Sequence, residues 1–102
     1  MTTLTLCDWA ATVHEIAREK GFYDTLDMET FESQAKQLAM MHSEVTEVLE
    51  ALRKDKGQDQ VVEEIADIII RTVDFYAALL NAGVVSDDLD DVMERKTATN
   101  SN

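Results

Sequence analysis

The sequence predicts an all-α protein built from four helices. Proline is absent and glycine occurs only three times, at positions 21, 57 and 83. Each glycine follows a stretch in which apolar residues recur at helical spacing, and glycine is common just beyond a helix C-terminus. No regular alternation of apolar and polar residues indicates a strand. The length of 102 residues suits one domain, residues 1–102.

The glycines divide the chain into four helical segments. The first three are expected at about residues 5–20, 30–54 and 59–81, and the fourth is expected to begin after Ser86 and to fade in the polar tail 97–102. Serine is a frequent N-cap, and the two aspartates that follow Ser86 favour a helix N-terminus electrostatically.

Two connections complete this four-helix subunit. The segment GFYDTLDME, residues 21–29, is expected to be a loop. The short connection DKGQD around Gly57 predicts that the second and third helices form an antiparallel central hairpin.

The composition limits the classes of partner. Lys and Arg number 9 and Asp and Glu number 21, so the net charge is −12. Such a surface disfavours direct binding to nucleic acid or to anionic membranes. Cys7 is the single cysteine and is expected to be a small buried side chain, since it cannot form an intrachain disulfide. With no signal-peptide pattern and no run of roughly 20 apolar residues, a cytoplasmic protein is expected.

The two central helices differ in pattern. The second carries an apolar seam in steps of three and four, which is expected to pack inward: Leu38, Met41, Val45, Val48 and Leu52. The third carries an apolar line, which consists of Val61, Ile65, Ile69, Thr72 and Tyr76. It also carries a charged line within an arc of about 80°, which consists of Glu64, Asp67, Arg71 and Asp74.

Apolar residues bracket this charged line on both sides, so it is expected to face the protein interior or a subunit interface. Buried carboxylates need partners. Arg71 could neutralise one of them as a structural ion pair, and Asp74 is expected to be an outer partner of Arg71.

Two acid pairs form a candidate metal site. Glu44 and Glu47 lie on the second helix, Glu64 and Asp67 on the third, and Glu47 and Asp67 are each ten residues from Gly57. The pairs should therefore sit at matching heights in the hairpin. Four facing carboxylates repel one another without a cation, and their oxygen ligands suit Mg²⁺ or Mn²⁺. These four residues are the predicted metal ligands.

The same acid pairs are also consistent with a solvated helix face, because acidic helices carry such spacing by chance. Other metals fit the sequence less well. A di-iron site would require Glu-x-x-His, but neither His14 nor His42 has a glutamate three residues earlier. No calcium-binding loop motif occurs in the sequence.

The motifs resemble those of the MazG-like all-α nucleoside triphosphate pyrophosphohydrolases. The acid motif is accompanied by HEIAREKGFYD, LAMMHSEVTEVLEALR and EEIADIIIRTVDF, so the resemblance covers about residues 14–100. The segment KTATN, from Lys96 to Asn100, resembles the family's K-x-x-x-N element. Where members commonly carry a basic residue just beyond the asparagine, this sequence has Ser101 and Asn102.

This resemblance implies a homodimer or a dimer of dimers, that is, a homotetramer. It also implies Mg²⁺-dependent hydrolysis of a nucleoside triphosphate to the monophosphate and pyrophosphate, with a plausible role in clearing non-canonical or surplus nucleotides. Glu44, Glu47, Glu64 and Asp67 would be metal ligands and catalytic residues. Lys96 and Asn100 would contact the triphosphate, and these contacts could come from a neighbouring subunit.

Several residues outside the acid motif are candidates for substrate contacts or for structural roles. Phe22 and Tyr23 lie in the predicted loop and could stack on a nucleobase. Lys36 lies two turns before Glu44 and could contact phosphate, or it could be a surface lysine. Trp9 is expected to pack in the core, and His14 and His42 are expected to be helix-face residues.

A second class of function is also consistent with the sequence. A non-enzymatic acidic helical module could use the same charged line to bind a basic partner. The two functions differ in whether a nucleotide is turned over.

Overall fold

The computed structural model describes residues 3–101 and confirms the all-helical fold. Its helices are α1 (Leu6–Glu19), α2 (Phe31–Arg53), α3 (Gln58–Asn81) and α4 (Leu89–Asn100), and the described residues contain no strand. The first three helices begin and end within one residue of the predicted bounds. No helix in this part of the chain combines the length and the apolar character needed to cross a membrane.

Side chains cap three of the four helix N-termini. Thr5 and Asp8 form a reciprocal capping box at the start of α1. Thr30 accepts a hydrogen bond from the Ser33 amide at the start of α2. The expectation that Ser86 caps the fourth helix is wrong: α4 begins at Leu89, because the Asp88 side chain accepts from the Asp91 amide three residues later.

Two of the predicted glycine C-caps are confirmed. Gly21 (φ 81°) and Gly83 (φ 75°) follow α1 and α3 in the left-handed conformation. Gly57 is instead the N-cap of α3. The left-handed position after α2 is held by Asp55 (φ 51°), since aspartate tolerates this conformation better than most residues.

The polar C-terminal tail is helical, contrary to the expectation that the fourth helix fades there. α4 continues to Asn100, and the Ser101 amide donates to the Thr97 carbonyl. The Thr99 hydroxyl donates to the Arg95 carbonyl at 3.0 Å. These bonds to preceding carbonyls satisfy the polar side chain and the last backbone groups without leaving the helical path. Asn102 lies outside the described residues.

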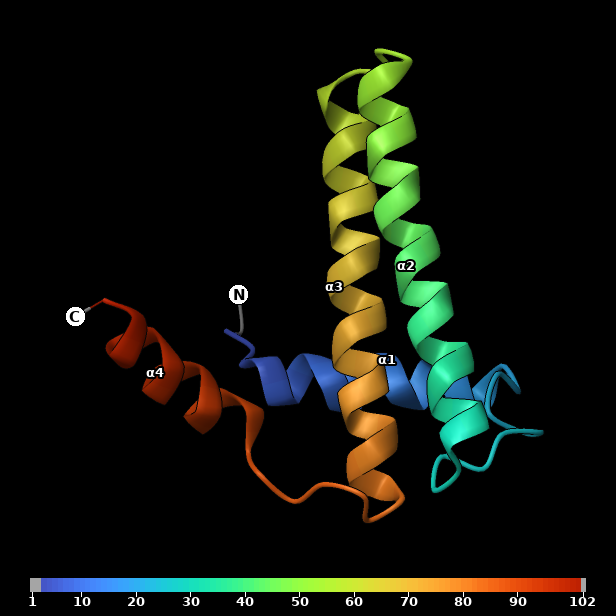
Figure 1. Cartoon of the computed structure of the whole chain (residues 1–102), viewed down its shortest axis with the longest axis vertical. Coiled ribbons are helices and arrows are strands. Elements are labelled where there is room, and N and C mark those ends of the chain that lie inside the picture. The colour runs from blue at the N-terminus through green and yellow to red at the C-terminus, as the bar shows by residue number, and fades with distance from the viewer. Residues whose placement is uncertain (1–2, 102) are drawn as a thin grey trace.

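Figure 1 shows α2 and α3 side by side over most of their lengths, joined at one end by residues 54–57. α1 crosses α3 near the other end, while α4 projects away from α2 and α3. α4 packs against α1, and its first residue, Leu89, also contacts Tyr76 of α3.

Hydrogen bonds fix the start of α4. The Tyr76 hydroxyl donates to the Asp87 carbonyl at 2.7 Å and accepts from the Leu89 amide at 3.2 Å. Asp90 accepts from the first two amides of α1, those of Leu6 and Cys7, at 3.0 and 3.1 Å. Cys7 is therefore half-buried beside a helix terminus and is not the fully buried side chain expected from the sequence.

The core of a single subunit is thin. The buried apolar residues are mostly small: Ala10, Ala17, Met28, Ala51, Val73, Ala77 and Ala78. The seam of α2 packs inward only in part, because Leu38, Val45 and Leu52 keep 46, 52 and 61% of their surface exposed. On α3, Ile65 and Ile69 are also exposed. α2 has only α3 as a neighbouring helix, so the rest of its apolar surface is uncovered.

Candidate metal centre

Three of the four predicted acids converge between α2 and α3. Glu44 from α2 and Glu64 and Asp67 from α3 each place one carboxylate oxygen within 4.8 Å of the others. Glu44 and Glu64 are half-buried, whereas Asp67 is exposed. Residues 20 or more apart in sequence are thus brought to one point by the packing of the two helices.

The donor set and its spacing fit a hard divalent cation. An octahedral Mg²⁺ with bonds of about 2.1 Å has opposite ligands about 4.2 Å apart. Three carboxylate oxygens within 4.8 Å of one another need only small side-chain movements to reach this arrangement. All three donors are oxygens, which favours Mg²⁺ or Mn²⁺ over softer metals.

Glu47 does not belong to this cluster. It is exposed, one helical turn beyond Glu44 on α2. Residues three apart on a helix point about 60° away from one another. Glu64 and Asp67 share this spacing and do converge, so which acids meet depends on how α2 is rotated against α3. The predicted cage of four carboxylates is therefore a cluster of three, with Glu47 beside it.

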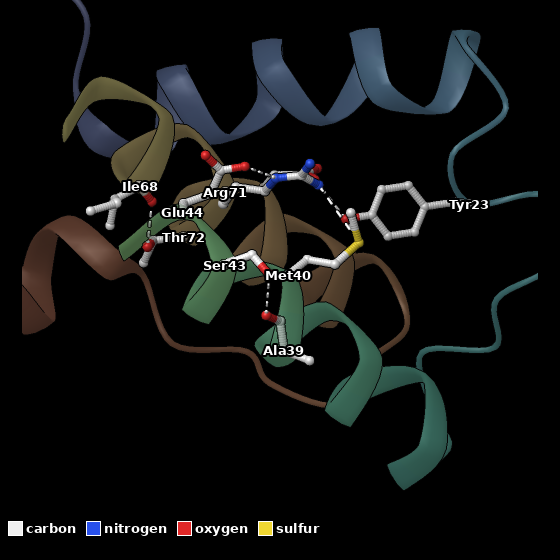
Figure 2. Close-up of polar contacts among 9 residues, drawn as sticks. Tyr23, Ala39, Met40, Ser43, Glu44, Ile68, Arg71 and Thr72 are labelled. Carbon is white, nitrogen blue, oxygen red and sulfur yellow. Dashed lines mark hydrogen bonds and ion pairs between the residues drawn. The ribbon is translucent and has the colours of Figure 1, made fainter. Parts of the chain in front are cut away.

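Arg71 pairs with the cluster from α3. Its Nε donates to Glu44 Oε1 at 3.4 Å across the helix interface, with the two side chains 31 and 19% exposed. Its Nη1 lies 4.0 Å from the Met40 sulfur, and Figure 2 shows the guanidinium reaching from α3 towards both α2 residues, with the Tyr23 ring beyond it. The predicted neutralising role of Arg71 thus falls on Glu44.

A buried polar network that the sequence did not reveal lies on the next turn of α3. Asp74 is 7% exposed, and its Oδ1 lies 2.7 Å from His14 Nδ1 while its Oδ2 accepts from the Tyr23 hydroxyl at 2.7 Å. The rings of His14 and Tyr23 pack edge to face at 4.7 Å. Burial and the hydrogen bond to Asp74 raise the pKa of Tyr23. The expectations that Asp74 partners Arg71 and that His14 is an ordinary helix-face residue are therefore wrong.

The only sequence signal for this network was the position of Asp74 in a charged line between apolar neighbours. Its partners lie 60 and 51 residues away, in α1 and in the loop that follows α1. Such long-range pairs are set by how α1 crosses α3, which local patterns do not encode.

A cavity of about 470 Å³ adjoins the acid cluster. Its apolar lining comes from α1, the following loop and α3, and consists of Val13, Ile16, Ala17, Phe22 and Ile70. Glu44, Asp67 and Asp74 line it together with two cations, Arg71 and Lys20. Lys20 was not predicted as a site residue; its place directly before the predicted aromatic loop was the available signal.

The other predicted contacts are scattered. Phe22 lines the cavity and is 59% exposed, whereas the Tyr23 hydroxyl is bound to Asp74. Lys36 is exposed on α2 and does not line this cavity. Lys96 and Asn100 are exposed on the part of α4 that projects away from α2 and α3, so one subunit alone does not bring them to the acids.

Trp9 and His42, which the sequence predicts to have structural roles, are also exposed. Trp9 keeps 49% of its surface exposed, so the expectation that it packs in the core is wrong. Ala10, which packs against Val73 and Ala77 of α3, is the next residue, and neighbouring helix residues point about 100° apart, so Trp9 lies beside that contact. His42 is exposed on α2, as expected of a helix-face residue.

Comparison of the chain with protein-family models, with curated proteins and with solved structures gave no match. The function is therefore inferred from the geometry described above, together with the resemblance of its motifs.

Removing an acid of the cluster should weaken Mn²⁺ binding selectively. Glu64→Gln is expected to lower Mn²⁺ affinity by more than about tenfold, because even residues that only support a metal ligand contribute 10- to 100-fold. Glu47→Gln should change it by less than about threefold, since Glu47 lies outside the cluster. Calorimetric titration measures both, with Glu50→Gln as a control; equal losses for Glu64→Gln and Glu50→Gln would contradict the assignment.

The Asp74 network should contribute more to stability than the other tyrosine bond. Tyr23→Phe removes a bond to a buried carboxylate and should cost about 1.5–3 kcal/mol, against about 1 kcal/mol for Tyr76→Phe, whose partners are neutral. Urea unfolding at one fixed protein concentration compares them.

The pH dependence follows from the raised pKa of Tyr23. A pKa above the unfolded value means that this stabilisation is complete below about pH 10 and declines as the pH rises further. If Tyr23→Phe and Tyr76→Phe lower the free energy of unfolding equally at pH 7, the stronger contribution assigned to the Tyr23–Asp74 bond is contradicted.

Proposed function

We propose that this chain is a Mg²⁺-dependent nucleoside triphosphate pyrophosphohydrolase that releases a nucleoside monophosphate and pyrophosphate. The observation that carries the proposal is the convergence of Glu44, Glu64 and Asp67 beside a cavity with an apolar wall and two cations. The resemblance to MazG-like pyrophosphohydrolases supports the same activity. Mn²⁺ is an alternative ion.

The chain's own residues divide the work. Glu44, Glu64 and Asp67 would hold the cation, which when bound polarises phosphate oxygens and offsets their charge. The apolar wall would accommodate the nucleoside, with Phe22 available to stack on the base. Glu47 is free of the cluster, so it is the candidate for accepting a proton from the attacking water.

The proposed active form contains at least two copies of the chain. Large apolar residues are exposed along one face of α2 at seven-residue intervals, and others continue the exposed surface on both helices: Phe31, Leu38, Val45, Leu49, Leu52, Val62, Ile65 and Ile69. An exposed apolar surface of this extent is unusual for a monomer. A second copy would cover it as a four-helix bundle of two α2–α3 pairs.

This assembly also offers a role for the projecting α4. Lys96 and Asn100 would reach the acid cluster of the other subunit, where the lysine would offset charge on the pyrophosphate leaving group. A cytoplasmic role in clearing non-canonical or surplus nucleotides is proposed on the resemblance.

Turnover of nucleotides tests the activity directly. The wild-type chain should release pyrophosphate from at least one member of a panel of canonical, deoxy and damaged triphosphates, only with Mg²⁺ or Mn²⁺. Glu64→Gln should abolish release while circular dichroism shows unchanged helix content. Glu50→Gln serves as the matched control, since Glu50 pairs with Arg53 and Lys54 on the same helix.

No turnover across the whole panel would contradict the proposed hydrolase. Binding of a basic partner that weakens with rising salt would then favour the acidic interaction module.

The assembly should be disrupted by a charge on the exposed apolar face. Leu49→Glu is expected to weaken association by at least about a hundredfold, because an unpaired charge in an apolar interface is costly. Val84→Glu is the control, as Val84 is comparably exposed but lies outside α2 and α3. Sedimentation velocity at several concentrations measures both; a wild-type chain that is monomeric throughout would overturn the proposed assembly.

A further inference from the structure

We propose that Arg71 binds the phosphate chain of the substrate directly, in addition to orienting Glu44. Its Nε would keep the bond to Glu44 while its Nη groups take phosphate oxygens in the adjoining cavity. The inference rests on the proposed function and assigns a phosphate contact within the same subunit, which Lys96 on α4 cannot supply there.

The guanidinium has hydrogen-bonding capacity to spare. Arginine carries five N–H donors, and Arg71 uses Nε on Glu44 and directs Nη1 towards the Met40 sulfur, which is a weak acceptor. Among residues 3–101, Glu44 is the only carboxylate within 4.0 Å of this guanidinium. The Arg71 side chain is 31% exposed and lines the cavity beside Glu44 and Asp67, so incoming oxygens can reach it.

Asp74 does not compete for Arg71, although it lies three residues further along α3. One oxygen of Asp74 lies 2.7 Å from His14 Nδ1 and the other accepts from the Tyr23 hydroxyl. Both oxygens are thus already engaged, and the network leaves Arg71 directed towards α2 and the cavity. The charged residues on α3 therefore have separate partners. Asp74 binds Tyr23 in the loop after α1, and Arg71 pairs with Glu44 of the acid cluster.

The charge balance of the site also requires this arginine. Four carboxylates lie in the cluster and the cavity lining, Glu44, Glu64, Asp67 and Asp74, against the two positive charges of Arg71 and Lys20. One divalent cation would bring that sum to zero. Without Arg71 the loaded site would still be negative and would repel a triphosphate, and Lys20 would be the one cation left among the residues that line the cavity.

The geometry of the contact favours arginine over lysine. A planar guanidinium presents its Nε and Nη donors together and can serve a carboxylate and a phosphate at once. A lysine ammonium at the same place is a single point charge on a shorter reach. Arg71→Lys therefore keeps the charge and removes only the two-sided contact.

Binding experiments on the full chain separate the two sides of this contact. Mn²⁺ is titrated first, and inorganic tripolyphosphate is then titrated into the Mn²⁺-loaded protein. At saturating Mn²⁺, Arg71→Lys should weaken tripolyphosphate binding by about tenfold or more, the loss of one charge-assisted hydrogen bond, and by more than it weakens Mn²⁺ binding through Glu44. Arg53→Lys is the matched control, because Arg53 also pairs with a glutamate of α2, at 3.5 Å, but is 66% exposed.

Three results would overturn the inference. The first is equal tripolyphosphate binding by the wild type and Arg71→Lys. The second is an equal loss of Mn²⁺ and tripolyphosphate affinity, which would mean that Arg71 acts only through Glu44. The third is a wild-type chain that does not bind tripolyphosphate in Mn²⁺.

A labelling experiment on the wild type keeps the test decisive if Arg71→Lys does not fold. Bound tripolyphosphate would cover the Arg71 guanidinium. Tripolyphosphate with Mn²⁺ should therefore slow the modification of Arg71 by phenylglyoxal about tenfold relative to Mn²⁺ alone, and should leave the modification rate of Arg53 unchanged. Equal rates at Arg71 would overturn the inference.

The proposed hydrolase activity is tested separately, by the release of pyrophosphate. Protection of Arg71 without release of pyrophosphate from any nucleotide supports the phosphate site and contradicts the proposed activity. Hydrolysis with an unchanged KM in Arg71→Lys contradicts the phosphate site and leaves the activity standing.

Discussion

Repulsion among Glu44, Glu64 and Asp67 is the constraint on which this structure depends. Two unit charges 4.8 Å apart repel by about 3.5 kcal/mol at the effective dielectric of a protein surface, and by less where Asp67 meets solvent. Arg71 offsets part of this repulsion through Glu44, and the Gln60 side-chain amide donates to Glu64 at 2.6 Å. The packing of α2 on α3 must supply the rest unless a cation is bound, so the proposed ion binding would be coupled to folding at this point.

The same pair of helices carries the uncovered apolar surface. The subunit buries mainly alanines, and no large side chain in residues 3–101 is fully buried. Little inside one subunit therefore resists a shift of α2 along α3. A second copy packed on the exposed face, as proposed above, would clamp both helices and fix the distances between Glu44 and the two acids of α3. Assembly and ion affinity would then be linked, each stabilising the other.

Local signals predicted the helices well, and the site only in part. Threonines and glycines near the helix ends act through neighbouring residues, so the first three helices could be placed to within one residue. Gly57 shows the limit, because left-handed Asp55 had already closed α2 and the glycine serves the next helix. Glu47 shows another: its spacing matched the motif, but which side chains meet depends on how α2 is rotated against α3. The partners of Asp74 could not be predicted from local patterns, since they lie 51 and 60 residues away in the sequence.

Successive turns of α3 connect these features. Asp67 contributes to the acid cluster, Arg71 pairs with Glu44 one turn later, and Asp74 binds Tyr23 and His14 on the turn after that. Tyr23 directly follows Phe22, so the bond to Asp74 also holds that wall of the cavity beside the acids. A rigid helix cannot move one of these turns without the others. The cavity wall, Arg71 and the two acids of α3 therefore keep one fixed relation, and such fixed positioning would suit the proposed role of placing a phosphate chain between a nucleoside and a cation.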